Sequence, residues 1–123
     1  MIAATFLCLA PIATDGDTLK CQNGRRVRIA GIEANERGGG CHLDRCPTMP
    51  ARQAKATLQR LVYRKRLVCQ PVGKSWSRIV ARCVLSGNGL KTHKLDLSCA
   101  AIASGAAVRW DRFWARYRMG ECR

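Results

Sequence analysis

The order of the predicted strands and helices constrains the fold of this chain more than any other feature. Apolar or alternating stretches predict five short strands, at 5–13, 18–21, 26–32, 67–72 and 79–85. Apolar residues at helical spacing predict an amphipathic helix over 50–64, with Thr48 as its N-cap. Three strands, a helix and two further strands follow one another in the order of an oligonucleotide-binding (OB) barrel.

The C-terminal part of the chain predicts further helical structure. Asp96 or Ser98 is expected to cap a helix that ends at Gly105. Four aromatic residues of the tail fall on one helical face: Trp110, Phe113, Trp114 and Tyr117. This spacing favours packing of the aromatic face against the barrel, with stacking on nucleobases as the alternative.

The length of 123 residues fits a single domain with one core. We therefore expect a mainly β fold with helices over 1–123, a five-stranded OB barrel with two to three helices. Residues 1–7 are expected to be loosely ordered, and 109–123 to form an aromatic and basic tail.

The charge of the chain points to an anionic partner. The formal net charge is +14, and residues 45–95 contain twelve Lys or Arg and no Asp or Glu. Such a surface attracts polyanions, among which nucleic acids are the commonest. There are two alternatives: the charge attracts anionic lipid, or it serves only to keep the protein soluble. Lys55, Arg60 and Arg64 on the predicted helix are interpreted as a solvated basic face that adds non-specific affinity.

The longest uncharged stretch, residues 1–14, is too short to cross a bilayer. It is interpreted as a buried first strand, in preference to a remnant of a targeting segment. No membrane span is expected, and the chain is expected to be a monomer.

Eight cysteines occur, and none of them has the C-x-x-C spacing of zinc or thioredoxin-like sites. An even number in a short chain favours disulfides and an extracytoplasmic, oxidising location, with reduced and buried thiols as the alternative. The predicted strands suggest four pairs: Cys8–Cys21, Cys41–Cys46, Cys69–Cys83 and Cys99–Cys122.

The carboxylates are few and gathered together. Of eight acidic residues, four fall within 22 positions, namely Asp15, Asp17, Glu33 and Glu36. Carboxylates bind hard cations such as calcium and magnesium, while arginines bind phosphate oxygens through two parallel hydrogen bonds. Together with the basic surface, this set is typical of a site that hydrolyses phosphodiesters.

Three segments resemble the motifs of the thermonuclease-like (staphylococcal nuclease) family. They are D-G-D-T at 15–18, V-R-I-A-G-I-E-A-N-E at 27–36 and W-S-R-I-V-A at 76–81. Asp96-Leu97-Ser98 and the apolar residues up to Gly105-Ala106 are also similar to that family. The resemblance covers most of residues 8–108. It implies a barrel of the OB type that cleaves DNA or RNA with calcium and leaves 3′-phosphates.

The resemblance also implies which residues act on the phosphate. Arg28 and Arg78 match the family's two phosphate-binding arginines, which stabilise the transition state. Glu36 matches its catalytic glutamate. These three residues are the predicted catalytic groups.

The same resemblance implies a calcium site. Asp17 and Glu33 match the metal-binding carboxylates, although the family normally has aspartate at the second position. The carbonyl of Ala34 stands where the family uses a backbone ligand, and Asp15 matches a supporting aspartate. Another divalent cation remains an alternative.

Two other functions remain open from the sequence. A catalytically weakened module of the same fold would bind DNA or RNA without cleaving it. A secreted, cationic and disulfide-rich protein would act on anionic membranes. His42 and His93 lie in polar loops and are assigned no role.

Overall fold

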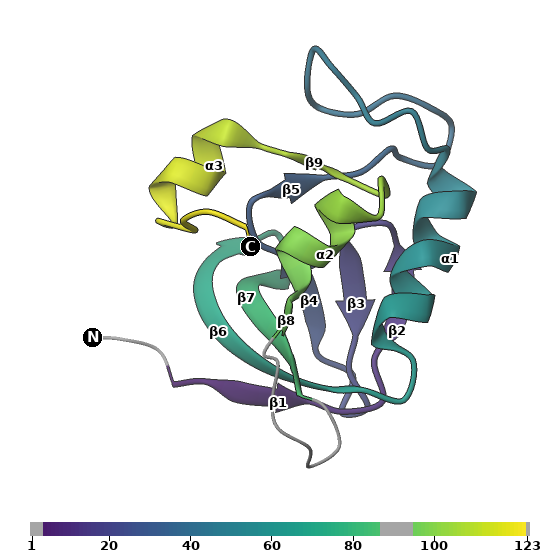
Figure 1. The fold of residues 1–123 in the computed structure, drawn as a ribbon. Coiled ribbons are helices and arrows are strands. Elements are labelled where there is room, and N and C mark those ends of the chain that lie inside the picture. Colours follow the sequence, from purple (N-terminus) through teal and green to yellow (C-terminus); the bar gives the residue numbers. More distant parts are fainter. Residues whose placement is uncertain (1–3, 87–94, 123) are drawn as a thin grey trace.

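The structure, a computed structural model, describes residues 4–86 and 95–122 (Figure 1). In these residues a mixed sheet curls into a half-barrel accompanied by three helices, so the predicted class, mainly β with helices, is confirmed. The strands are β1 (Phe6–Cys8), β2 (Ile12–Asp15), β3 (Thr18–Lys20), β4 (Arg26–Ile29), β5 (Ile32–Glu33), β6 (Arg66–Ser75), β7 (Arg78–Ser86), β8 (Leu95–Asp96) and β9 (Val108–Arg109). The helices are α1 (Ala51–Val62), α2 (Leu97–Ala103) and α3 (Asp111–Arg116).

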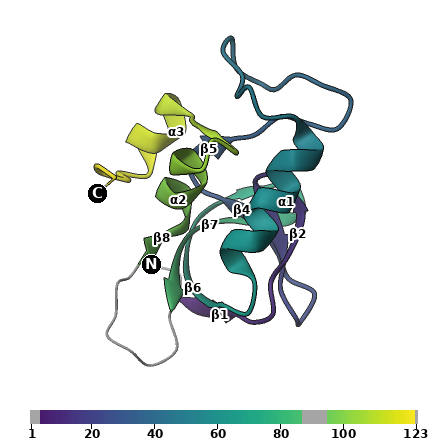
Figure 2. The same cartoon turned by 45° about the vertical axis from the view of Figure 1, so that its right-hand side comes forward.

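The large sheet has the order β1-β6-β7-β4-β3-β2, and β8 is added beside β7. β4 and β7 are parallel, whereas the other pairs are antiparallel. β5 and β9 form a separate two-stranded sheet. The strands β1 and β2, which lie at the two ends of this order, follow each other closely in the chain, so the sheet curls back toward itself (Figure 2).

Two of the predicted strands are each divided in two. The stretch 5–13 is interrupted at Ala10, which has a φ of 46°, and at Pro11, which has no N–H for a ladder. The stretch 26–32 stops at Ile29 because Gly31 takes a φ of 77°. Residues 6 and 7, expected to be loosely ordered, belong to β1, whereas residues 1–3 lie outside the described part.

Helix α1 packs against β2 (Figure 1). The buried face of α1 includes Ala54 and Leu58. A Cβ at Gly16 would lie 2.8 Å from Ala54 Cβ, so this turn approaches the helix closely only because residue 16 is glycine. The predicted N-cap was wrong: Pro50 occupies that position, and no side chain caps the helix.

Helix α2 packs against β7, and α3 follows β9 near the C-terminal end. Asp96 caps α2 by accepting from the amide of Cys99, whereas the buried Ser98 donates to the carbonyl of Ala30 at 2.7 Å. Trp114 of α3 is buried over Gly31, where a Cβ would lie 2.9 Å from its ring. The tail is therefore packed onto the fold.

All four predicted disulfides are present: Cys8–Cys21, Cys41–Cys46, Cys69–Cys83 and Cys99–Cys122. Four disulfides are consistent with an oxidising location. Among residues 4–86 and 95–122, no helix has the length and apolar character needed to cross a membrane.

Replacing Cys99 and Cys122 together by serine should lower the melting temperature by about 10 °C. This disulfide joins residues 23 positions apart. A bond of this kind stabilises a protein by roughly 2–4 kcal/mol, and each kcal/mol corresponds to roughly 4 °C in a small domain. Thermal unfolding followed by circular dichroism would measure the change in melting temperature. The double variant Cys41→Ser, Cys46→Ser, which removes a disulfide that closes a short loop, is the control. An unchanged melting temperature would show that packing of Trp114 alone holds the tail.

Candidate functional site

All six residues predicted to act in catalysis or metal binding line one cavity. The cavity has a volume of about 310 Å³. Its lining comprises Thr14, Asp15, Asp17, Arg28, Glu33, Ala34, Asn35, Glu36, Arg37, His42 and Arg78. These residues come from the end of β2 and the turn that follows it, from β4, from β5 and the segment after it, and from the start of β7. Residues up to 64 positions apart therefore meet at one place.

Arg28 lies between two buried carboxylates. Its Nη1 is 3.4 Å from Asp17 Oδ2, and its Nη2 is 3.1 Å from Glu33 Oε1. The guanidinium also donates to the carbonyls of Ile29 and Ile32, at 3.2 and 3.0 Å. Because only 12% of this side chain is exposed, these contacts fix the orientation of its planar group.

Asp17 is a buried carboxylate whose charge is poorly compensated. Its Oδ1 accepts from the hydroxyl of Thr18 at 3.0 Å, and its Oδ2 accepts from the amide of Ala34 at 3.3 Å. Burial raises the pKa of Asp17 to about 7; Arg28 lowers it, and the adjacent Asp15 raises it further. A buried carboxylate with such a pKa would be stabilised in its charged form by an additional cation.

Asp15, the other aspartate of this turn, has a lowered pKa and is ionised at neutral pH. Burial raises the pKa of Asp15, but hydrogen bonds with Asp17 and Thr18, together with the charge of Arg28, outweigh burial and lower the pKa below 3.8. Its Oδ1 accepts from the amide of Asp17 at 3.0 Å. The two aspartates thus shift in opposite directions, as expected for neighbouring acids that share one environment.

Arg78 is the second arginine of the cavity, and its position follows from the parallel pairing of β4 and β7. In that pairing Arg28 is opposite Val80. The guanidinium of Arg78 donates to Thr18 Oγ1 and to Ser75 Oγ, both at 3.1 Å. Within the described part of the chain, Arg78 has no carboxylate at ion-pair distance. Its charge is therefore available to an anion that enters the cavity.

The loop after β5 places His42 in the cavity, a position that the sequence did not predict. Its amide donates to Glu33 Oε2, and its Nδ1 lies 2.7 Å from the same oxygen. Its Nδ1 is also 3.5 Å from Glu36 Oε1. The Cys41–Cys46 disulfide closes the loop beside it. His93 lies outside the described residues.

Asn35 anchors the same loop to the beginning of α1. Its amide nitrogen donates to the carbonyls of Pro47 and Met49, at 2.7 and 2.9 Å. These bonds restrain both ends of the loop that follows Glu36. The side chain of Glu36 is 57% exposed, so a water molecule can reach its carboxylate.

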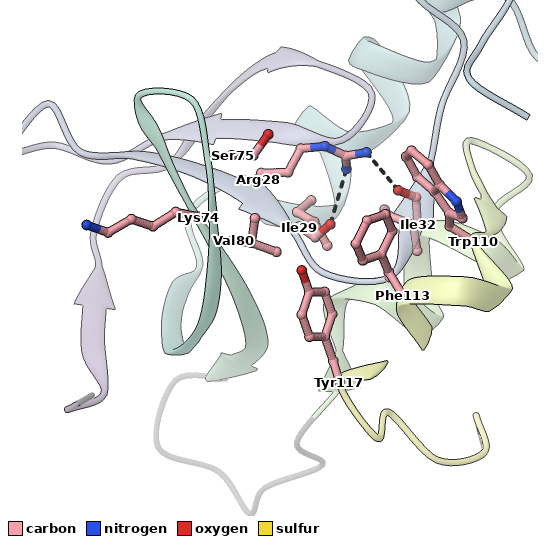
Figure 3. Close-up of a pocket in the computed structure, with 10 residues that line it drawn as sticks. Arg28, Ile29, Ile32, Lys74, Ser75, Val80, Trp110, Phe113 and Tyr117 are labelled. Carbon is pink, nitrogen blue, oxygen red and sulfur yellow. Dashed lines mark hydrogen bonds between the residues drawn. The ribbon is translucent and has the colours of Figure 1, made fainter. Parts of the chain in front are cut away.

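A second cavity, of about 170 Å³, adjoins the first and shares Arg28 with it (Figure 3). Trp110, Phe113 and Tyr117 form one of its sides (Figure 3). Trp110 and Phe113 meet edge to face, with ring centres 4.9 Å apart. The predicted packing of the aromatic face is therefore confirmed for Trp114, which is buried, whereas three of the aromatic residues line this cavity.

The larger cavity offers oxygen ligands that suit a hard cation such as calcium. Asp17 supplies a buried carboxylate whose oxygens contact Thr18, Ala34 and Arg28. Both oxygens of Glu33 have partners in Arg28 and His42. Within residues 4–86 and 95–122, no three side chains of the His, Cys, Asp or Glu type form a preformed metal centre. A cation in this cavity would therefore have at most two of these carboxylates as ligands, and water would have to complete its coordination.

No protein-family model matches the chain, and no curated protein matches it.

Proposed function

We propose that this protein is a nuclease of the thermonuclease-like family, which uses calcium or another divalent cation to hydrolyse phosphodiester bonds of DNA or RNA. One observation carries the proposal: all six residues that the sequence motifs single out line one cavity. If the resemblance were due to chance, there would be no reason for its three segments to meet in space. These segments are the turn at 15–18, the stretch 27–36 and the strand that begins at residue 78. The protein acts as a monomer under this proposal.

The proposed fold is a five-stranded barrel of the OB type. Two features of the sheet support it. β1 and β2, at opposite ends of the strand order, belong to one predicted strand, which would close the sheet. The parallel pairing of β4 with β7 joins the third and the fifth predicted strands. Nucleic acid would then bind across the strand face and its adjoining loops.

In the proposed reaction, the two arginines bind the phosphate. Arg78, which has only neutral hydrogen-bond partners, binds oxygens of the phosphate, and Arg28 stabilises the charge that develops in the transition state. Glu36 takes a proton from the water that attacks phosphorus. A bond forms between the water oxygen and phosphorus, the bond to the 5′ oxygen breaks, and that oxygen is protonated by solvent. The products are a 3′-phosphate and a 5′-hydroxyl.

Asp17, Glu33 and the carbonyl of Ala34 would hold the cation. Calcium, when bound, would neutralise part of the phosphate charge beside Arg28. The raised pKa of Asp17 supports this assignment, because it indicates a buried negative charge that lacks a sufficient counter-charge. Glu33 would hold the ion in competition with His42, whose amide and Nδ1 contact the same carboxylate.

The aromatic cavity would receive a nucleobase. Arg28 lines both cavities, so a nucleotide could place its phosphate in the polar one and its base against Trp110 and Phe113. The basic residues between 45 and 95 would bind further phosphates along the strand.

A module that binds nucleic acid without cleaving it is the second candidate. The engagement of Glu33 by both Arg28 and His42 favours it, because these contacts compete with a metal ion for the carboxylate. This candidate keeps the phosphate contacts of Arg28 and Arg78 but needs no cation.

A cleavage assay on fluorescent single-stranded DNA and RNA distinguishes the two candidates. We expect cleavage with calcium and loss of cleavage in EDTA. Glu36→Gln should lower kcat by about a hundredfold, the effect typical of losing a general base, with little change in melting temperature because the side chain is exposed. Glu121→Gln, at an exposed residue outside the cavity, is the matched control. If no cleavage occurred with calcium, magnesium or manganese, and binding did not depend on EDTA, the nuclease would be excluded. The module that binds nucleic acid without cleaving it would then be the remaining candidate.

A further inference from the structure

Three aliphatic residues near the N-terminal end of the sheet are exposed and close together in the chain. Leu7 is 55% exposed, Leu9 37% and Ile12 60%. Isolated exposed apolar side chains are common on proteins, whereas a group of them marks a surface that contacts another molecule. Residues 4–86 and 95–122 contain only three other large apolar side chains of comparable exposure, namely Tyr63, Trp76 and Leu95.

Basic side chains lie beside these aliphatic ones. Ile12 of β2 is opposite Lys20 of β3, and Lys20 is opposite Arg26 of β4. Residues that are opposite each other in a ladder share a face of the sheet, so these three exposed side chains form a row. The guanidinium of Arg25 lies 4.4 Å from the ring centre of Phe6 in β1. The two basic strand ends and β1 therefore border one surface.

This surface contains no acidic residue. Neither 4–12 nor 18–27 includes Asp or Glu. Within the part of the chain that the structure describes, Lys20, Arg25 and Arg26 form no ion pair with a carboxylate. Their positive charges are therefore not neutralised by the protein and are available to an anionic partner.

The apolar and basic segments are fixed to each other. The Cys8–Cys21 disulfide joins β1 to the turn between β3 and β4. The carbonyl of Leu9 accepts from the amide of Gln22 in that turn at 2.8 Å. In both views of the ribbon, β1 and this turn lie at the end of the molecule opposite the loop that joins β5 to α1 (Figures 1 and 2). That loop carries Glu36 and His42 of the polar cavity.

We infer that this surface, formed by Leu7, Leu9, Ile12, Lys20, Arg25 and Arg26, docks the protein on an anionic lipid bilayer. The aliphatic side chains would enter the boundary between headgroups and acyl chains, while the basic ones would contact anionic headgroups. The bound protein would keep the loop with Glu36 and His42 directed toward the solvent. The inference does not depend on the proposed nuclease activity.

The composition of the surface favours lipid over two other occupants. Leucine and isoleucine have no flat ring that could stack on a nucleobase, as the aromatic residues of single-strand binding proteins do. A second copy of the chain would bring the same basic residues face to face, and like charges repel each other. A bilayer with anionic headgroups accommodates both the apolar and the basic side chains.

The double variant Leu7→Thr, Ile12→Thr tests the inference. Threonine is β-branched and suits exposed strand positions, so the melting temperature should change by only a few degrees. Sedimentation with vesicles of phosphatidylglycerol and phosphatidylcholine in equal parts would measure the partition coefficient. We expect it to fall about a hundredfold in the variant, because two aliphatic side chains lose their burial in lipid. Vesicles of phosphatidylcholine alone should bind the wild type weakly, since they carry no net charge.

Lys20→Gln, Arg26→Gln tests the basic half of the surface independently. The partition coefficient should fall about thirtyfold, because each basic residue near an anionic membrane contributes a similar electrostatic attraction. Leu95→Thr is the matched control, since Leu95 is an exposed strand residue, at 42%, next to the acidic Asp96. β6 and β7 separate its strand from β1. This variant should bind the vesicles as the wild type does.

Four outcomes would overturn the inference. The first is that the wild type does not bind the anionic vesicles. The second is that Leu7→Thr, Ile12→Thr binds them as tightly as the wild type, which would assign the binding to the overall charge. The third is an equal loss of binding to a single-stranded oligonucleotide, which would make this surface part of a nucleic acid interface. The fourth is a dimer of the wild type that the variant dissociates in sedimentation velocity. Absence of nuclease activity would contradict the proposed function and leave this inference unaffected.

Discussion

Replacing Arg78 by alanine should lower kcat/KM for nucleic acid cleavage about a thousandfold, while the melting temperature changes by only a few degrees. Removal of one preorganised donor to a developing negative charge typically has an effect of this size. The small effect on stability follows from the contacts of Arg78, which are hydrogen bonds to Thr18 and Ser75 and include no ion pair. Initial cleavage rates at fixed ionic strength and thermal unfolding would measure both quantities.

Arg60→Ala is the control for this experiment, because it removes the same charge from an exposed position on α1. It should reduce binding only slightly and leave kcat unchanged. Equal kcat/KM values for the two variants would show that Arg78 belongs to the general basic surface. Arg28→Ala is less informative, because it would leave Asp17 and Glu33 buried without their cation, a loss of roughly 3–5 kcal/mol.

The parts of the fold that depend on local sequence could be predicted. The stretches 67–72 and 79–85 predicted two strands and the Cys69–Cys83 pair, and the observed antiparallel register places Cys69 opposite Cys83. The division of 5–13 depends on the conformation of Ala10, which the apolar pattern does not reveal, although Pro11 was a signal for it. Helix α1 ends at Val62 because Tyr63 is extended and Arg64 has a positive φ.

In the candidate site, too, some features could be predicted from the sequence and others could not. The six residues of the motifs were predicted to share one site because the resemblance to the thermonuclease-like family implies it, and they line one cavity. The contact of His42 with Glu33 could not be predicted, because it depends on how a loop containing three consecutive glycines, 38–40, folds over the cavity. Helical spacing placed Trp110 and Trp114 on one face, but it does not show which of them meets the core.

Replacing Asp17 by asparagine should increase stability in EDTA, and the increase should grow with pH. The pKa of Asp17 is about 7 in the folded protein, and its ordinary value is 3.8. As the pH rises between these values, the unfolded chain loses its proton before the folded one, so the free energy of unfolding falls. Asparagine resembles the neutral acid and avoids this loss. We expect similar melting temperatures at pH 4 and an advantage of about 5 °C for the variant at pH 8.

The same substitution should lower calcium-dependent cleavage about a thousandfold, because loss of a metal's charge stabilisation is worth several kcal/mol. Calcium should raise the melting temperature of the wild type at pH 8, since it binds only the folded state, and should not raise that of Asp17→Asn. Asp44→Asn, at an exposed loop residue outside the cavity, should behave as the wild type in both measurements. If calcium stabilised Asp17→Asn as much as the wild type, the ion would bind elsewhere. Asp17 would then act only as an ion-pair partner of Arg28.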